Sequence, residues 1–128
     1  MYTVKMDHLR NRLYVTMSGH MLPREMKDCT DRTISAARKL KPGYDVITDI
    51  SRCQVLSHEA MVEVRRAQDY LARFSAGHSL RVRGGAILTS IQFANTGKSV
   101  SYLPCTVATV ADAERYLEKQ TAQTVGVK

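Results

Sequence analysis

A strand pattern that leads directly into a helix pattern constrains the fold of this 128-residue chain more than any other feature. Residues 44–50 form a short, β-branched run bounded on one side by a Pro-Gly pair, which predicts a buried strand. Over residues 57–76 apolar side chains recur at helical spacing, and Ser57 and Glu59 suit the first turn of a helix. A strand followed by a helix in this way is typical of an α/β domain.

The segments on either side extend this alternation. Residues 2–18 alternate polar and apolar side chains with a period of two, which predicts two antiparallel strands joined by a hairpin link at 8–11. The other expected elements are a helix over 22–40, a strand over 80–89, a short helix over 90–95 that stops at Gly97, a strand over 105–109, and a final helix that begins near Thr109. Gly84-Gly85 weakens the strand at 80–89, so that its firm part is 86–89, and the pair marks either a bulge or a strand end.

The element order is therefore β-β-α-β-α-β-α-β-α. It predicts a single α/β domain with a mixed, mostly parallel sheet, right-handed crossovers and helices packed against the sheet. We expect this domain to span residues 1–119, and we expect a poorly ordered tail over residues 120–128.

The composition is that of an ordinary globular domain. Apolar residues make up 44% of the chain, and no apolar run approaches the length needed to cross a bilayer. The first residues lack the pattern of a secretory signal, and the three cysteines are odd in number and far apart. These features predict free thiols and a cytoplasmic protein.

The net charge of +7 raises the odds of an anionic partner. The basic residues, however, form separate short clusters interleaved with acidic ones, and no stripe of aromatic and basic residues is present. This distribution favours a solvated surface over a nucleic-acid interface.

The loop expected at residues 51–59 is the strongest candidate for a working surface. It would join the C-terminal end of a parallel strand to a helix N-terminus, where open α/β sheets bind ligands and where free N–H groups attract anions. The candidate binding residues are those of this loop and of the neighbouring strand end: Ser51, Arg52, Ser57, His58, Glu59, Thr89 and Ser90. The alternative is that Asp49 and Ser57 only cap turns and the helix.

Catalytic and metal motifs are not evident. Ser57, His58 and Glu59 are sequence neighbours, so their side chains diverge on a helical turn. Cys53 lies near a helix N-terminus, where a thiol pKa can fall, but the sequence identifies no partner for it and we interpret it as a small packed residue. The four histidines lack metal-ligand spacing, and a phosphate loop ending at Gly97-Lys98-Ser99 would need glycine where Gln92 stands. We therefore expect no enzyme activity, cofactor or metal.

Two short stretches resemble a known family. Val46-Ile47-Thr48-Asp49-Ile50-Ser51, followed by Leu56-Ser57-His58-Glu59-Ala60-Met61, is similar to the strand–loop–helix core of the STAS-like (SpoIIAA-like) superfamily. The resemblance extends more weakly to 86–88, to Phe93-Ala94 and to 107–117, and so covers most of the chain in element order. It implies a SpoIIAA-like fold and a non-enzymatic binding or regulatory module.

The chain departs from the family where the family carries its phosphorylation switch. His58 and Glu59 align with the switch serines, Ala60 aligns with the glycine that follows, and Ser57 is one place early. The resemblance therefore points to a divergent branch without the phospho-acceptor motif.

The expected function is a module that engages a protein partner or an anionic small ligand through residues 51–59. The alternative is a small enzyme, or a nucleotide- or lipid-binding protein, that uses the same loop. The sequence leaves a homodimer open.

Overall fold

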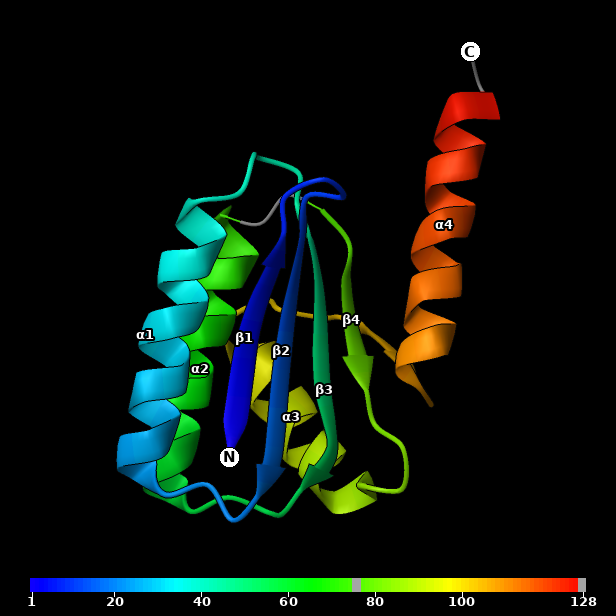
Figure 1. The fold of residues 1–128 in the computed structure, drawn as a ribbon. Coiled ribbons are helices and arrows are strands. Elements are labelled where there is room, and N and C mark those ends of the chain that lie inside the picture. Colours follow the sequence, from blue (N-terminus) through cyan, green and yellow to red (C-terminus); the bar gives the residue numbers. More distant parts are fainter. Residues whose placement is uncertain (75–76, 127–128) are drawn as a thin grey trace.

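Nine elements follow one another in the computed structural model, which describes residues 1–74 and 77–126 (Figure 1). The strands are β1 (Tyr2–Asp7), β2 (Arg12–Gly19), β3 (Asp45–Cys53), β4 (Ser79–Val82) and β5 (Cys105–Val107). The helices are α1 (Pro23–Arg38), α2 (His58–Phe74), α3 (Ile87–Ser99) and α4 (Val110–Gly126). The strands form one sheet in the order β1-β2-β3-β4-β5, antiparallel between β1 and β2 and parallel elsewhere. The predicted element order and the mixed, mostly parallel sheet are thus confirmed.

The β1–β2 hairpin has the predicted link, and its side chains alternate as predicted except at Met6, which is exposed, and Arg12, which is buried. Tyr2 pairs with Met17 at one end and Asp7 with Arg12 at the other. Asn11 turns the chain with a φ of 54°, a left-handed conformation that Asn tolerates better than most residues. Its side chain also binds the main chain of Lys41, which ties the hairpin to the segment before β3.

Helices cover the two faces of the sheet unequally. In Figure 1, α1, α2 and α3 lie on one face and α4 lies alone on the other. The main core lies beneath the first three helices and includes Leu13, Val15, Val46 and Ile50 of the sheet. A smaller core under α4 consists of five buried residues: Ile47, Leu80, Val82, Ala113 and Leu117.

The segment after β4 differs from the prediction. The strand expected over 80–89 ends at Val82, and the residues expected to be its firm part lead into and begin α3, which runs well past the helix expected at 90–95. Gly84 explains the early end, because its φ of +52° forms a turn and a Cβ there would lie 2.8 Å from the Cβ of Ser51. Gly97 does not stop α3 but lies buried within it, where a Cβ would come within 2.5 Å of the Tyr102 carbonyl oxygen.

Two expected boundaries fall near residues that the structure does not describe. The helix expected over 57–76 ends at Phe74, and residues 75–76 lie outside the described residues. The last helix continues through Gly126, so residues 120–126 of the expected tail are helical, and residues 127–128 lie outside the described residues.

Candidate functional site

The candidate site lies at the edge where the parallel strands end. The C-terminal ends of β2, β3 and β4 point to the lower end of the molecule in Figure 1, and α1, α2 and α3 begin there. A parallel sheet with helices returning over it places strand ends and helix N-termini at one edge. The segment from β3 to α2 therefore lies where the sequence places the working surface.

Part of the expected loop is strand. Ser51, Arg52 and Cys53 belong to β3, because β2 runs far enough to pair with it through Ser18–Arg52 and Gly19–Cys53, beyond an irregularity between Thr16 and Ser18. Only residues 54–57 form the connection to α2. The loop is thus shorter, and its first half more firmly held, than the sequence indicates.

A shallow polar hollow of about 190 Å³ lies at the end of β3 and is lined by Thr16, Met17, Asp49, Ser51 and Arg52. One carboxylate oxygen of Asp49 accepts hydrogen bonds from the Ser51 amide at 2.9 Å and the Ser51 hydroxyl at 2.6 Å. The hollow is smaller than the pockets that usually enclose small ligands, and the Asp49 carboxylate opposes an anion within it. These features favour a protein contact over a small anionic ligand.

The start of α2 has a structural role in addition to any contact. The Ser57 hydroxyl oxygen accepts a hydrogen bond from the Ala60 amide at 3.2 Å, which caps the helix. His58 and Glu59 are exposed, and neither forms a hydrogen bond or ion pair with the residues that the structure describes. The capping alternative therefore holds for Ser57, while His58 and Glu59 are free for contact with a partner.

Thr89 and Ser90 do not form a surface. Both are buried in α3, and the Thr89 hydroxyl donates to the Cys53 carbonyl oxygen at 2.8 Å. The expected proximity of Thr89 to the β3–α2 segment is present, but its polar atom is used in packing. The sequence prediction misplaces Thr89, which lies in a helix rather than at a strand end, whereas Ser90 is helical as expected but is buried rather than part of a binding surface.

Gln92 makes a second link between α3 and the loop. Its side-chain amide accepts from the Leu56 N–H at 2.9 Å and donates to the Leu56 carbonyl oxygen at 2.7 Å. These two bonds satisfy both main-chain groups of a residue outside regular structure. The first turns of α3 and the loop thus form one continuous surface.

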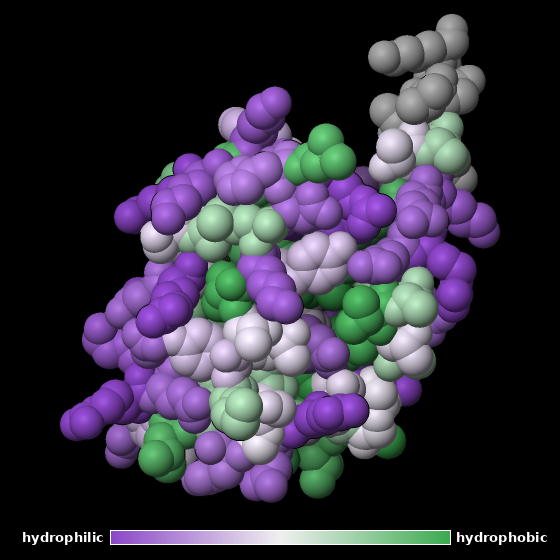
Figure 2. All heavy atoms as spheres, viewed as in Figure 1, coloured by the Kyte–Doolittle hydropathy of each residue, from purple (hydrophilic) through white to green (hydrophobic). Residues whose placement is uncertain are grey.

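That surface carries exposed apolar side chains. Val55 of the loop and Ile87, Leu88 and Ile91 of α3 are each 50–70% exposed. Leu88 precedes Gln92 by one helical turn and so lies on the side of α3 that meets the loop, with Ile91 beside it. We call these four residues the apolar stripe. Figure 2 shows apolar side chains reaching the surface at the same lower end of the molecule.

Sequence reasoning did not find the apolar stripe. Its three helical members fall in or next to the stretch expected as a strand, where apolar residues are ordinary core. The available signal was that residues 87, 88 and 91 share one side of a helix if the helix starts at residue 87 rather than 90.

The cysteines do not form a reactive centre. Burial raises the pKa of the Cys53 thiol to about 11 and that of Cys29 to about 12, so both stay protonated at neutral pH. Cys105 is exposed, and all three thiols are free, as the sequence predicts.

Among the residues described, no group of three or more His, Cys, Asp or Glu side chains is placed to hold a metal ion. Likewise, no helix within residues 1–74 and 77–126 combines the length and apolar character needed to span a bilayer.

Comparison with known proteins gives an informative likeness among solved structures. Neither a family model nor a curated protein matches the sequence. Among solved structures, the unphosphorylated form of the anti-sigma factor antagonist SpoIIAA superimposes with a TM-score of 0.65, covering 92% of this chain and 98% of that one at 12% identity. The superposition confirms the fold expected from the sequence: this chain adopts the SpoIIAA-like, or STAS-like, α/β fold.

Proposed function

We propose that this protein is a non-enzymatic regulatory module that binds a protein partner through the edge formed by the end of β3, the loop at 54–57 and the start of α3. The apolar stripe carries the proposal. These four large apolar side chains are exposed on the loop and at the start of α3, at the edge where the parallel strands end, and they are not needed to build the core. Surfaces of this kind mark protein contacts, in which buried apolar residues supply the binding energy.

The charged residues beside the apolar stripe suit the rim of such an interface. Arg52, His58 and Glu59 are exposed, and no ion pair involves them among the described residues. Arginine at an interface forms charge-assisted hydrogen bonds with carboxylates, which adds specificity to apolar contact. Arg52→Ala should therefore weaken partner binding by on the order of 1–3 kcal/mol and leave stability nearly unchanged.

The fold supports a regulatory role for this surface. SpoIIAA, which shares the fold, is an anti-sigma factor antagonist. Because His58 and Glu59 replace the serines expected in that family, the module we propose acts without the phosphorylation switch. Incubation with a kinase of the type that modifies the family should leave the protein unmodified, and stoichiometric phosphate on Ser57 would contradict this part of the proposal.

The test compares two variants that each replace two exposed apolar side chains. Leu88→Asp with Ile91→Asp disrupts the apolar stripe, whereas Leu9→Asp with Leu103→Asp changes two leucines elsewhere that are even more exposed. Each tagged variant and the wild type are used to capture proteins from the source cell, and each captured protein is then purified and titrated by calorimetry. A partner should bind the wild type and the Leu9/Leu103 variant equally and lose at least tenfold in affinity for the Leu88/Ile91 variant. Equal affinity for all three would reject the proposed surface.

A further inference from the structure

A second feature lies beneath the helices, on the inner face of the sheet. Arg81 occupies β4 between Leu80 and Val82, and both neighbours are buried under α4. Because side chains alternate along a strand, Arg81 points to the opposite face, beneath α3. It pairs across the sheet with Thr48, which pairs with Val15, so it lies in the same layer as the main core. Only 3% of Arg81 is exposed.

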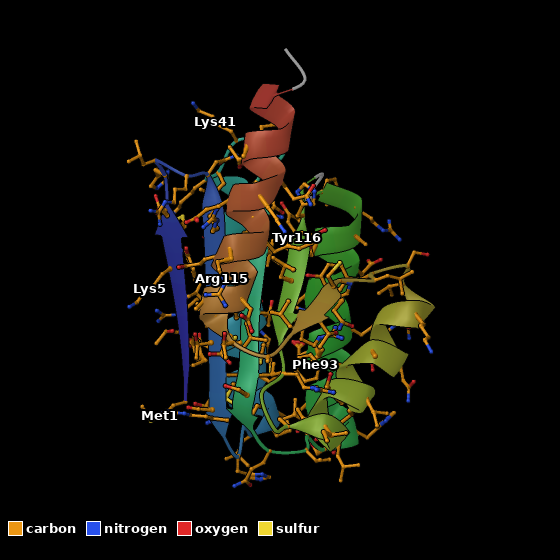
Figure 3. All side chains as sticks on the ribbon, turned by 90° about the vertical axis from the view of Figure 1, so that its right-hand side faces the viewer. Met1, Lys5, Lys41, Phe93, Arg115 and Tyr116 are labelled. Atoms are coloured by element: carbon orange, nitrogen blue, oxygen red, sulfur yellow. The ribbon has the colours of Figure 1, made fainter. Side chains whose placement is uncertain are left out.

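Among the side chains that the structure describes, none forms an ion pair or hydrogen bond with the Arg81 guanidinium. Its guanidinium carbon lies 5.7 Å from the centre of the Phe93 ring. Figure 3 shows Phe93 between α3 and the sheet. Burial lowers the pKa of Arg81, while the nearby Tyr102 hydroxyl opposes this change. A cation–π contact offsets only part of the cost of burying a charge, which is several kcal/mol for an ion without a partner.

A cavity lies beside Arg81. It has a volume of about 30 Å³ and is lined largely by apolar atoms, together with the polar residues Thr33, Thr48, Gln68, Arg81 and Tyr102. Gln68 has its side-chain nitrogen bonded to the Phe93 carbonyl oxygen at 3.1 Å, but its side-chain oxygen is buried without a partner. The cavity has room for about two water-sized particles. A buried cation thus lines one small, mostly apolar space, and a buried acceptor without a partner lies in a neighbouring side chain.

We propose that this cavity is a binding site for a small monovalent anion the size of a halide, held against the Arg81 guanidinium. The anion neutralises the buried charge and accepts the guanidinium hydrogen bonds. Sulfate and phosphate are too large for the space and would place two negative charges against one positive charge in apolar surroundings. The site is independent of the surface proposed for partner binding.

The direct test is crystallographic. Crystals of the full chain are grown in sodium bromide and, separately, in sodium gluconate, whose anion is too large for the cavity, and data are collected at the bromine absorption edge. An anomalous peak in the cavity next to Arg81 is expected in bromide and not in gluconate. A cavity that is empty or contains only water in the bromide crystal would overturn the proposal.

A solution test uses thermal unfolding while bromide replaces gluconate at constant ionic strength. The wild type should show a saturable rise in Tm, because a ligand that binds only the folded state stabilises it. Arg81→Met keeps an unbranched but shorter side chain and removes the charge, and it should abolish the rise. Arg65→Met removes an exposed arginine of α2 and should show the same rise in Tm as the wild type.

A rise of equal size in all three proteins would mean a general salt effect and would reject the site, as would no rise in the wild type. If Arg81→Met does not fold, the wild-type titration and the bromide crystal decide the question.

Discussion

Helices α3 and α4 each follow a short parallel strand, yet they are held to the sheet in different ways. In α4, Ala113 and Leu117 face the sheet and are at most 1% exposed. In α3, Phe93 is the large apolar side chain buried against the core, while Ile87, Leu88 and Ile91 face outward. Burial against the sheet explains Ala113 and Leu117 of α4. It does not explain Ile87, Leu88 and Ile91 of α3, and their exposure is the reason to propose a partner outside the chain.

Helix α3 buries few apolar side chains and is attached to the rest of the molecule by hydrogen bonds. Thr89 binds the Cys53 carbonyl oxygen, Gln92 binds both main-chain groups of Leu56, and Gln68 of α2 binds the Phe93 carbonyl oxygen. Hydrogen bonds are directional, so they fix the position of a helix more narrowly than apolar contact does. We infer that these hydrogen bonds hold the apolar stripe in a fixed position against the loop.

The largest expected difference between the two helices is in the free energy of unfolding of two matched leucine variants. Leu117→Ala in α4 removes a side chain that is 1% exposed and should lower the free energy of unfolding by about 2–5 kcal/mol. Leu88→Ala in α3 makes the same chemical change at a residue that is 70% exposed and should stay within about 0.5 kcal/mol of the wild type. Urea unfolding measures both, and similar losses would remove the contrast between the helices.

Gly97→Ala tests how closely α3 approaches the chain that follows it. Alanine favours a helix by about 1 kcal/mol over glycine, but its Cβ would lie 2.5 Å from the Tyr102 carbonyl oxygen. This oxygen belongs to the backbone, and the Tyr102 amide also donates to the Gly97 carbonyl oxygen at 2.9 Å, so it cannot move freely. We expect a net loss of about 1–3 kcal/mol in the free energy of unfolding. A more stable variant would show that α3 has room to shift.

Gln92→Leu tests the polar attachment itself. The change leaves the N–H and carbonyl of Leu56 without their partner, and the expected loss is about 1–2 kcal/mol because water reaches this partly buried site. Hydrogen exchange should also become faster at the Leu56 amide, while amides in the middle of α4 keep their protection. Unchanged exchange at Leu56 would mean that the loop holds its position without α3.

The sequence predicts α4 more correctly than it predicts α3, for a physical reason. The Thr109 hydroxyl caps α4 by accepting from the Asp112 amide at 3.1 Å, and Ala113 and Leu117 form its inner face, as local spacing indicates. The stretch Ala86–Thr89 is a short apolar run, and periodicity alone does not separate a strand from a helix in such a run. The turn at Gly84 and the contacts of Thr89 make this stretch helical, and the contacts of Thr89 are made with residues far away in the sequence.

In the candidate site too, the sequence predicts the features set by local order and misses those set by distant contacts. The sequence locates the β3–α2 segment at the correct edge and identifies Ser57 as a helix cap, because both follow from local order. It misses that Ser51 and Arg52 lie in β3, since the end of that strand is set by pairing with β2, about 35 residues earlier in the chain. It also misses the buried setting of Arg81, which depends on α2 and α3 closing over the sheet.

The smallest expected effect on stability is the most informative for function. Ile91→Ser replaces an exposed apolar side chain of the apolar stripe with a polar one, and Ile91 is 51% exposed on the outward side of α3. The free energy of unfolding should change by no more than about 0.5 kcal/mol, since little apolar surface leaves the core. Binding to a purified partner, measured by calorimetric titration, should weaken by roughly 1–3 kcal/mol, because Ile91 loses its contact only in the complex. Val62→Ser is the matched control, since Val62 is 56% exposed on α2 outside the apolar stripe and should leave both quantities unchanged. If Ile91→Ser lost stability but kept its binding, the outward apolar residues of α3 would stabilise the fold as those of α4 do, and the proposed difference between the two helices would be wrong.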